Sequence, residues 1–292
     1  MKRRDLLKAL PLAAVLAPLR AQSGGQKFRI SLAEWSFHKA IFARMMTNQD
    51  FPRVAREQFG IEGLEFVNGL WEAPTAGYVK RLKKSMNDNG CKGVLVMCDD
   101  EGSMGASSKA ERMKAAENHY KWADIAADLG CHSIRCNMHG DKEAQTPAEI
   151  TSLIDNCSDS FAKLCEYGKG RGINIIIENH GGASSDPDVL VRLMKKVDLP
   201  NFGVLPDFGN FYGKTDRYDA LKKMMPYAKG VSFKCYDFGP DGKEQRWDMD
   251  RMMKIVSEAG YHNWVGIEYE GDKIPEFEGV QRAKRYLDNW LA

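Results

Sequence analysis

The chain has 292 residues and is 43% hydrophobic, which allows one large α/β barrel or two ordinary domains. Its formal net charge is +2, and Lys and Arg are scattered among Asp and Glu without a basic stripe interleaved with aromatic residues. We therefore expect no nucleic acid partner. After the N-terminal segment no apolar run is long enough to span a bilayer, so we expect no membrane anchor once that segment is removed.

A basic and then apolar segment opens the chain. Lys2-Arg3-Arg4-Asp5-Leu6-Leu7-Lys8 precedes an apolar stretch from Ala9 to Leu19. This order resembles a twin-arginine export signal, which implies a signal peptide over residues 1–21, a mobile segment over residues 22–27 and a periplasmic location. The alternative is a basic, Leu-rich amphipathic helix at the N-terminus.

From residue 28 onward, short apolar runs alternate with longer segments of helical period. The predicted strands are Phe28–Leu32, Gly63–Phe66, Lys92–Met97, Ser133–Cys136, Asn174–Glu178, Gly203–Leu205, Val231–Lys234 and Val265–Glu268. The predicted helices are Phe51–Phe59, Tyr78–Asn87, Ala110–Leu129, Pro147–Tyr167, Pro187–Val197, Tyr218–Met225, Met249–Ala259 and Gly279–Leu291. Eight strand–helix units without a composition shift predict a single (β/α)8 TIM barrel over residues 28–292. A doubly wound open sheet is the alternative, but no Gly-rich phosphate-binding motif follows a predicted strand.

Seven cysteines lie mostly in apolar stretches. Their odd number and the absence of C-x-x-C spacing argue against a disulfide framework or a zinc knuckle. We expect most of them to be small buried thiols, and oxidation of one pair stays open.

Three apolar runs in the second half of the chain each end in a carboxylate. These carboxylates are Glu178 after three isoleucines, Asp207 after Val204-Leu205-Pro206, and Glu268 after Val265-Gly266-Ile267. Acids at the ends of buried strands are costly to desolvate, so several of them together indicate a bound cation or proton transfer. In a barrel the carboxyl ends of the strands converge on one mouth, where we expect these acids to meet.

The alternation of side chains along a strand selects further candidates at this mouth. His180 shares a face with Glu178, Ser232 with Lys234, and Glu270 with Glu268. Other polar or aromatic side chains follow the strand ends and suit recognition of hydroxyl groups. The candidate substrate contacts are Trp35, His38, Arg135, Asn137, Asn179, Asn210 and Glu270.

Structural explanations compete with these roles. A structural ion pair is the alternative explanation for Glu178, and a salt bridge is the alternative for Lys234. Asp207 could cap a short helix over residues 208–212. A Trp at position 35 serves a core as readily as a sugar-stacking platform.

Three segments carry a family resemblance. Ile176-Ile177-Glu178-Asn179-His180, Pro206-Asp207-Phe208-Gly209-Asn210 and Gly266-Ile267-Glu268-Tyr269-Glu270-Gly271 resemble the xylose isomerase-like barrels of the sugar phosphate isomerase/epimerase superfamily. The resemblance implies a divalent cation held by Glu178, Asp207 and Glu268. Family members commonly have a His-x-Lys-Asp run on the seventh strand, whereas this chain has Ser232-Phe233-Lys234-Cys235. Because Ser232 replaces the His, Mn²⁺ or Mg²⁺ is favoured over Zn²⁺; alternatively, Lys234 compensates the acids and no metal binds.

The resemblance implies an isomerase or epimerase that acts on a small carbohydrate. Glu178 and Glu268 would remove and return a proton on carbon, and Lys234 and His180 would hydrogen-bond oxygens or carry protons. Export favours a free sugar or keto-sugar over a phosphorylated one. Two alternatives remain open, a lyase that cleaves keto-glycosides by β-elimination and a non-catalytic periplasmic sugar-binding barrel. Barrels of this kind often pair, so a homo-oligomer is compatible with the resemblance.

Overall fold

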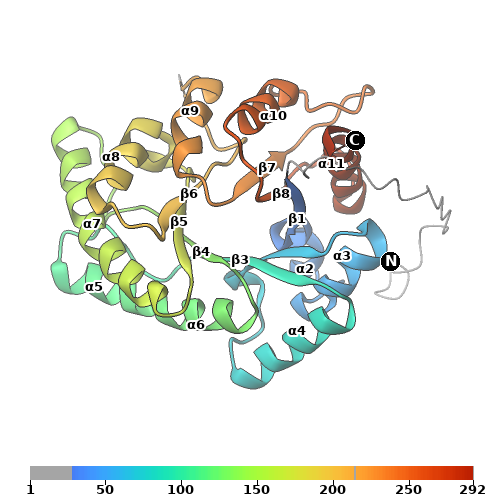
Figure 1. Cartoon of the computed structure of the whole chain (residues 1–292), viewed down its shortest axis with the longest axis horizontal. Coiled ribbons are helices and arrows are strands. Elements are labelled where there is room, and N and C mark those ends of the chain that lie inside the picture. The colour runs from blue at the N-terminus through green and yellow to red at the C-terminus, as the bar shows by residue number, and fades with distance from the viewer. Residues whose placement is uncertain (1–27, 214, 292) are drawn as a thin grey trace.

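Eight parallel strands form one sheet that curls into a barrel with helices on its outside (Figure 1). The computed structural model describes residues 28–213 and 215–291. The strands are β1 (Arg29–Ala33), β2 (Gly63–Val67), β3 (Lys92–Cys98), β4 (Ser133–Cys136), β5 (Asn174–Glu178), β6 (Phe202–Leu205), β7 (Val231–Cys235) and β8 (Trp264–Tyr269). Their order is β6-β5-β4-β3-β2-β1-β8-β7, so the predicted fold class is confirmed, and each predicted strand end lies within one residue of the observed one.

The two edge strands, β6 and β7, close the barrel through only a few contacts. Isolated bridges pair Val204 with Ala228 and Asp207 with Ser232. The Ser232 N–H donates to the Pro206 carbonyl at 2.9 Å, whereas Pro206 itself has no N–H to donate in return. The β6–β7 seam therefore brings Asp207 directly beside Ser232 at the mouth of the barrel.

Apart from α2, which the sequence does not predict, the α-helices follow the predicted segments closely. They are α2 (His38–Phe42), α3 (Phe51–Phe59), α4 (Ala76–Asp88), α5 (Lys109–Asn118), α6 (Tyr120–Asp128), α7 (Pro147–Lys169), α8 (Pro187–Val197), α9 (Arg217–Met224), α10 (Met249–Glu258) and α11 (Glu276–Leu291). The predicted capping box at Thr146 and Glu149 is present at the start of α7. The prediction of one helix over residues 110–129 is wrong, because the chain tightens at His119, whose N–H donates to the Ala116 carbonyl and ends α5 there.

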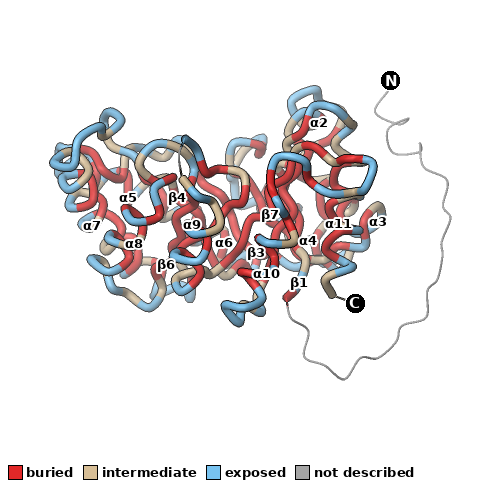
Figure 2. The backbone as a smooth tube through the Cα atoms, turned by 90° about the horizontal axis from the view of Figure 1, so that it is seen from above, coloured by how far each residue is buried: buried red, intermediate tan, exposed pale blue. Residues whose placement is uncertain are grey.

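Alternation along the strands divides the core into two layers. On β5, Ile175 and Ile177 pack outward in the large cluster shared with the helices, whereas Ile176 belongs to the smaller cluster inside the barrel. Figure 2 shows the buried residues running along the strands and the exposed ones on the turns around them. Glu178 follows Ile176 by two positions, so the same alternation directs its carboxylate into the barrel mouth.

The predictions for the N-terminal segments, for membrane-spanning helices and for the cysteines compare with the structure as follows. The predicted signal peptide (residues 1–21) and the mobile segment (residues 22–27) lie outside the described residues. Among the described residues, no helix has both the length and the apolar character needed to cross a membrane. All seven cysteines are buried free thiols, as the sequence predicts for most of them.

Candidate active site

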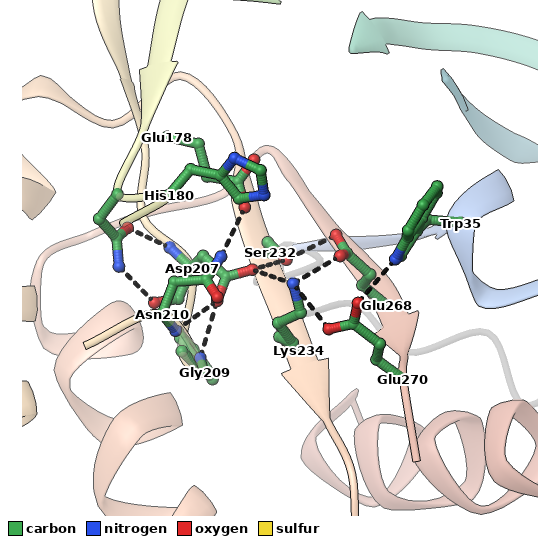
Figure 3. A network of polar contacts seen from close by, with 12 residues as sticks. Trp35, Glu178, His180, Asp207, Gly209, Asn210, Ser232, Lys234, Glu268 and Glu270 are labelled. Carbon is green, nitrogen blue, oxygen red and sulfur yellow. Dashed lines mark hydrogen bonds and ion pairs between the residues drawn. The ribbon is translucent and has the colours of Figure 1, made fainter. Parts of the chain in front are cut away.

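Three predicted acids from different strands meet at the barrel mouth (Figure 3). Glu178 ends β5, Asp207 follows β6 and Glu268 lies on β8, and their residues are only 2%, 0% and 4% exposed. One oxygen from each carboxylate lies within 4.8 Å of the others. Such a cluster of like charges in a buried place requires positive charge or protonation to be stable.

Lys234 on β7 supplies positive charge inside this acidic cluster. Its Nζ lies 2.9 Å from Glu268 Oε1, 3.1 Å from Glu270 Oε2 and 4.0 Å from Asp207 Oδ2 (Figure 3). Burial opposes the charge on Lys234, yet Glu268 and the other acids hold its pKa well above its usual value. The ammonium therefore stays charged at neutral pH and neutralises part of the cluster.

Ser232 occupies the position at which the family resemblance implies a His. Its Oγ donates to Asp207 Oδ2 at 2.7 Å and also lies 3.3 Å from Glu268 Oε2. A hydroxyl that bridges two carboxylates orients both of them and leaves their remaining lone pairs free. The shorter side chain also leaves more room in the cluster than an imidazole would.

Glu178 is held from two sides. Asn210 Nδ2 donates to Glu178 Oε1 at 3.0 Å, and Arg135 Nε lies 3.0 Å from Glu178 Oε2. The Arg135 contact is an ion pair without an aligned hydrogen bond, so Oε2 has no hydrogen-bond partner among the described residues. Burial raises the pKa of Glu178 to about 7, with Arg135 acting in the opposite direction. A carboxyl poised near neutrality is suited to both taking and returning a proton.

Asp207 is fixed by a turn. Its Oδ1 accepts the N–H groups of Gly209 and Asn210 at 2.8 and 2.9 Å, and no helix begins over residues 208–212. Asn179, which the sequence selects as a substrate contact, is completely buried, and its amide both donates to and accepts from the Asp207 backbone. Both amide atoms of Asn179 therefore bond the Asp207 backbone, and the observed role of this side chain is to position Asp207.

An aromatic wall lies on the β1 side of the mouth. The Trp35 ring stacks on His38 at 4.6 Å between centroids, and Trp35 Nε1 donates to Glu270 Oε1 at 2.8 Å. Phe42 meets Trp35 edge-on and is strongly exposed. Trp35 therefore couples this wall to the acidic cluster through Glu270, whose other oxygen contacts Lys234.

The β3–β5 side of the mouth carries a polar group around Arg135. Asp99 Oδ1 accepts from Arg135 at 2.5 Å and from Asn137 Nδ2 at 2.7 Å. Burial raises the pKa of Asp99, but the stronger combined effect of Arg135 and the hydrogen bonds lowers it below its usual value. Burial lowers the pKa of His180, which favours a neutral imidazole at this position.

Comparison with known proteins decides the family. Residues 53–290 match the family model described as "Xylose isomerase-like TIM barrel". The chain belongs to the xylose isomerase-like TIM barrel family. Its mouth of converging strand ends is where barrel enzymes carry their chemistry.

Individual relatives of this family member are distant. The chain is 22% identical over 256 residues to an inosose dehydratase of Erwinia tasmaniensis, covering 81% of this chain and 80% of that protein. The apo structure of 3-keto-D-glucoside 4-epimerase YcjR from E. coli superposes with a TM-score of 0.70 at 14% identity, covering 90% and 98% of the two chains. A xylose isomerase-like TIM barrel protein from Mycobacterium smegmatis, solved in complex with magnesium, superposes with a TM-score of 0.67 at 16% identity, covering 91% and 98%. At these identities the structures establish a shared fold.

The residues of the xylose isomerase-like site fit a hard divalent cation. One oxygen from each of Glu178, Asp207 and Glu268 lies within 4.8 Å of the others. Oxygens in an octahedral Mg²⁺ shell lie about 3 to 4.2 Å apart, so a cluster of this size is compatible with such an ion. Glu178 Oε2 also lacks a hydrogen bond among the described residues. These three carboxylates would hold the ion, and water would complete an all-oxygen shell that Mg²⁺ and Mn²⁺ accept and Zn²⁺ favours less.

Three contributors to the site were not among the residues that the sequence selects. Tyr236 packs beside the mouth, where a Cβ on Gly209 would lie 3.0 Å from its ring. Asp99 pairs with Arg135, and Glu65 is buried below the cluster. Alternation from Lys234 to Tyr236 was a usable signal for the tyrosine, whereas Asp99 carries no such pattern.

Glu65 on β2 is a fourth acid inside the barrel. Its Oε1 accepts from Ser31 Oγ at 2.6 Å, and its Oε2 has no hydrogen-bond partner among the described residues. Gly266 makes the room for it, since a Cβ at that position would clash with Glu65 Oε1. Burial raises the pKa of Glu65 to about 8, with Glu268 and Glu178 adding to the shift.

Replacement of Glu65 by Gln is expected to change how stability depends on pH. Glu65 ionises near 4.5 in the unfolded chain and near 8 in the fold, so the folded state holds an extra proton between these values. The contribution of Glu65 to stability is therefore complete below pH 4.5 and is lost as the pH rises through 8. The Tm of Glu65→Gln should rise relative to wild type from pH 5 to pH 9, as measured by scanning calorimetry. A Tm difference that stays constant over this range would contradict the assignment.

Proposed function

We propose that the protein is a sugar isomerase or epimerase that moves a proton on the carbon next to a carbonyl group. The observation that carries the proposal is the meeting of Glu178, Asp207 and Glu268 with one buried ammonium, that of Lys234. Two carboxylates from opposite sides of a barrel mouth can address both faces of one carbon. The family and the epimerase and dehydratase relatives support the same class of chemistry.

Each charged group has a task in this mechanism. Glu178 takes the proton from carbon with a carboxylate lone pair that the cation does not use, because burial raises the pKa of this carboxyl to about 7. Glu268 returns a proton from the other side in an epimerisation. Lys234 Nζ, held between Glu268 and Glu270, stabilises the negative charge that develops on the substrate oxygen. Trp35 and His38 present an aromatic face on which a sugar ring can stack.

A divalent cation belongs to this proposal as a cofactor of the site. Bound by Glu178, Asp207 and Glu268, Mn²⁺ or Mg²⁺ supplies a Lewis acid for the carbonyl and the neighbouring hydroxyl oxygens. The magnesium complex of the Mycobacterium smegmatis relative supports this assignment. The orienting roles of Ser232 toward Asp207 and of Asn210 toward Glu178 hold with or without the ion.

A lyase acting on keto-glycosides is the second candidate. The inosose dehydratase relative favours it, because loss of water and loss of a glycosidic alcohol both begin with removal of a proton next to a carbonyl.

We also propose that residues 1–21 act as a twin-arginine export signal and that the enzyme works in the periplasm. A free or oxidised sugar is then a more suitable substrate than a phosphorylated one.

Metal analysis and a deuterium exchange assay test the proposed function. Purified protein is expected to contain Mn²⁺ or Mg²⁺ and to exchange deuterium from D₂O into the carbon next to the carbonyl of at least one sugar in a panel of ketoses and 3-keto-glucosides, followed by NMR. Removal of the cation by chelation should lower this exchange at least about tenfold, because it removes one catalytic group. Exchange without net aldose–ketose conversion would favour an epimerase or lyase. No exchange and no cation would instead favour a sugar-binding barrel without catalysis.

A further inference from the structure

A second cavity opens beside the candidate active site. It measures about 440 Å³ and is formed by the segments that follow β4 and β5, together with the first half of α7. Asn137 and His180 line it, and both also belong to the barrel mouth. The cavity is therefore an extension of the site.

Only a few residues connect this cavity with Glu178 of the acidic cluster. Asn137 hydrogen-bonds Asp99, which contacts Arg135, and Arg135 lies 3.0 Å from Glu178. His180 follows Glu178 by two residues, and its imidazole makes no hydrogen bond to any described residue (Figure 3). The cavity therefore lies next to the acidic cluster, on the side of Asn137 and His180.

The lining of the cavity combines apolar and polar groups. Met138 and Leu153 are buried and form an apolar part, whereas His180 and Glu143 provide polar groups in the lining. A sugar ring has the same mixed character, with an apolar face and a hydroxylated rim.

The charges at the cavity argue against an anionic ligand. Lys142 lines it, but its Nζ is engaged with Glu149 Oε1 at 2.7 Å. Glu143 forms no ion pair with a described residue, and its Oε1 would lie 3.8 Å from a Cβ on Gly182, so it adds negative charge at the edge of the cavity. A phosphate would meet this carboxylate without a free cation to offset it.

We propose that this cavity is a subsite for a second sugar ring, joined to the ring that reacts at Glu178. The proposal rests on the proposed function and narrows its substrate class to uncharged disaccharides or related glycosides. The volume of about 440 Å³ is within the range of small-ligand sites and holds one ring with its hydroxyl groups. Binding energy from the second ring then assists the reaction of the first, so two-ring substrates react faster.

Filling the cavity tests this subsite. Ala144 lines the cavity, whereas Ala148 lies four residues further along, is exposed and does not line it, so Ala144→Phe and Ala148→Phe form a matched pair. Deuterium exchange is measured with methyl 3-keto-D-glucoside and with 3-keto-cellobiose or 3-keto-maltose. For wild type, kcat/KM for a two-ring substrate should be at least about tenfold higher than for methyl 3-keto-D-glucoside, because binding of the second ring assists the reaction of the first. Ala144→Phe should remove this advantage and leave the one-ring rate unchanged within about twofold, and Ala148→Phe should behave as wild type.

A second variant and a binding experiment keep the subsite and the proposed function separable. Glu143→Ala changes an exposed side chain and should raise KM for the two-ring substrate alone. Equal kcat/KM for both substrate sizes in wild type, or equal loss on both with Ala144→Phe, would overturn the subsite and leave the proposed function standing. If no keto-sugar exchanges, calorimetric titration with cellobiose, maltose and methyl glucoside decides. If a disaccharide binds more tightly than methyl glucoside and Ala144→Phe abolishes this difference, the subsite is supported although the proposed catalysis is not. If none of these sugars binds, the subsite and the proposed function are both refuted.

Discussion

Replacing Glu178 by Gln is expected to lower deuterium exchange by about 10² to 10⁴-fold, the usual contribution of a positioned acid–base group. The amide has nearly the shape of the carboxyl and can still accept from Asn210, but it cannot take a proton from carbon. Exchange into the carbon next to the carbonyl is measured by NMR in D₂O, with the circular dichroism spectrum recorded to show that the fold is retained.

Glu166 offers a matched control for this substitution. It lies on α7, is exposed and has no part in the mouth, so Glu166→Gln should exchange at the wild-type rate. Retained exchange in Glu178→Gln would remove Glu178 from the mechanism. A loss of similar size in Glu166→Gln would point to a general effect on the protein instead.

Replacing Lys234 by Met is expected to destabilise the protein by about 3–5 kcal/mol, as breaking one side of a buried ion pair usually does. The ammonium is almost fully buried, and its removal leaves Glu268 and Asp207 without their nearest protein cation. The free energy of unfolding is measured by urea titration with and without 5–10 mM Mn²⁺ (on the order of a large excess over a typical site Kd). Mn²⁺ should stabilise Lys234→Met more than wild type, because the ion then replaces the ammonium beside Glu268 and Asp207.

Lys243 provides the comparison at the surface. Its ion pair with Asp250 is about half exposed, so Lys243→Met should cost far less stability than Lys234→Met. If Lys234→Met lost no more stability than Lys243→Met, the buried acids would have to be protonated in the fold, and the neutralising role given to Lys234 would be wrong.

The part of the site that depends on local pattern could be predicted from the sequence. Ile175 and Ile177 pack outward, so Ile176 and Glu178 point inward. This assignment follows from alternation along the strand alone and needs no knowledge of residues elsewhere in the chain. Likewise Lys234 and Ser232 share the interior face of β7 and reach the acids as expected. Convergence of parallel strand ends in a barrel then brings the three carboxylates together.

The tasks of the amide side chains could not be predicted in this way. Asn179 and Asn210 follow strand ends and are typical of substrate contacts, yet they hydrogen-bond Asp207 and Glu178. These partners lie 28 and 32 residues away in the chain, and their pairing depends on the relative height of β5 and β6. Nothing in the spacing of the sequence reports that height.

Residues on long connections were equally inaccessible. Asp99 follows β3 and meets Arg135 of β4, and the side cavity depends on how the segments after β4 and β5 fold back onto α7. Such segments have no period to read, and their conformation is set by tertiary contacts. The fold class was therefore the most predictable feature and the shape of the substrate space the least.

The sparse seam between β6 and β7 bears on how this barrel can change. Strands elsewhere in the described sheet are joined by ladders of several paired residues, with one register shift between β2 and β3, whereas β6 and β7 are joined only by isolated bridges, one of them between Asp207 and Ser232. A shift of β6 against β7 at this seam breaks few strand-to-strand hydrogen bonds, whereas Asn179 and the turn at Gly209 hold Asp207 itself. Substitutions along the β6–β7 seam are therefore expected to move the Asp207 carboxylate, and with it to change the preferred ion or sugar stereochemistry. The other seven strand pairings stay intact.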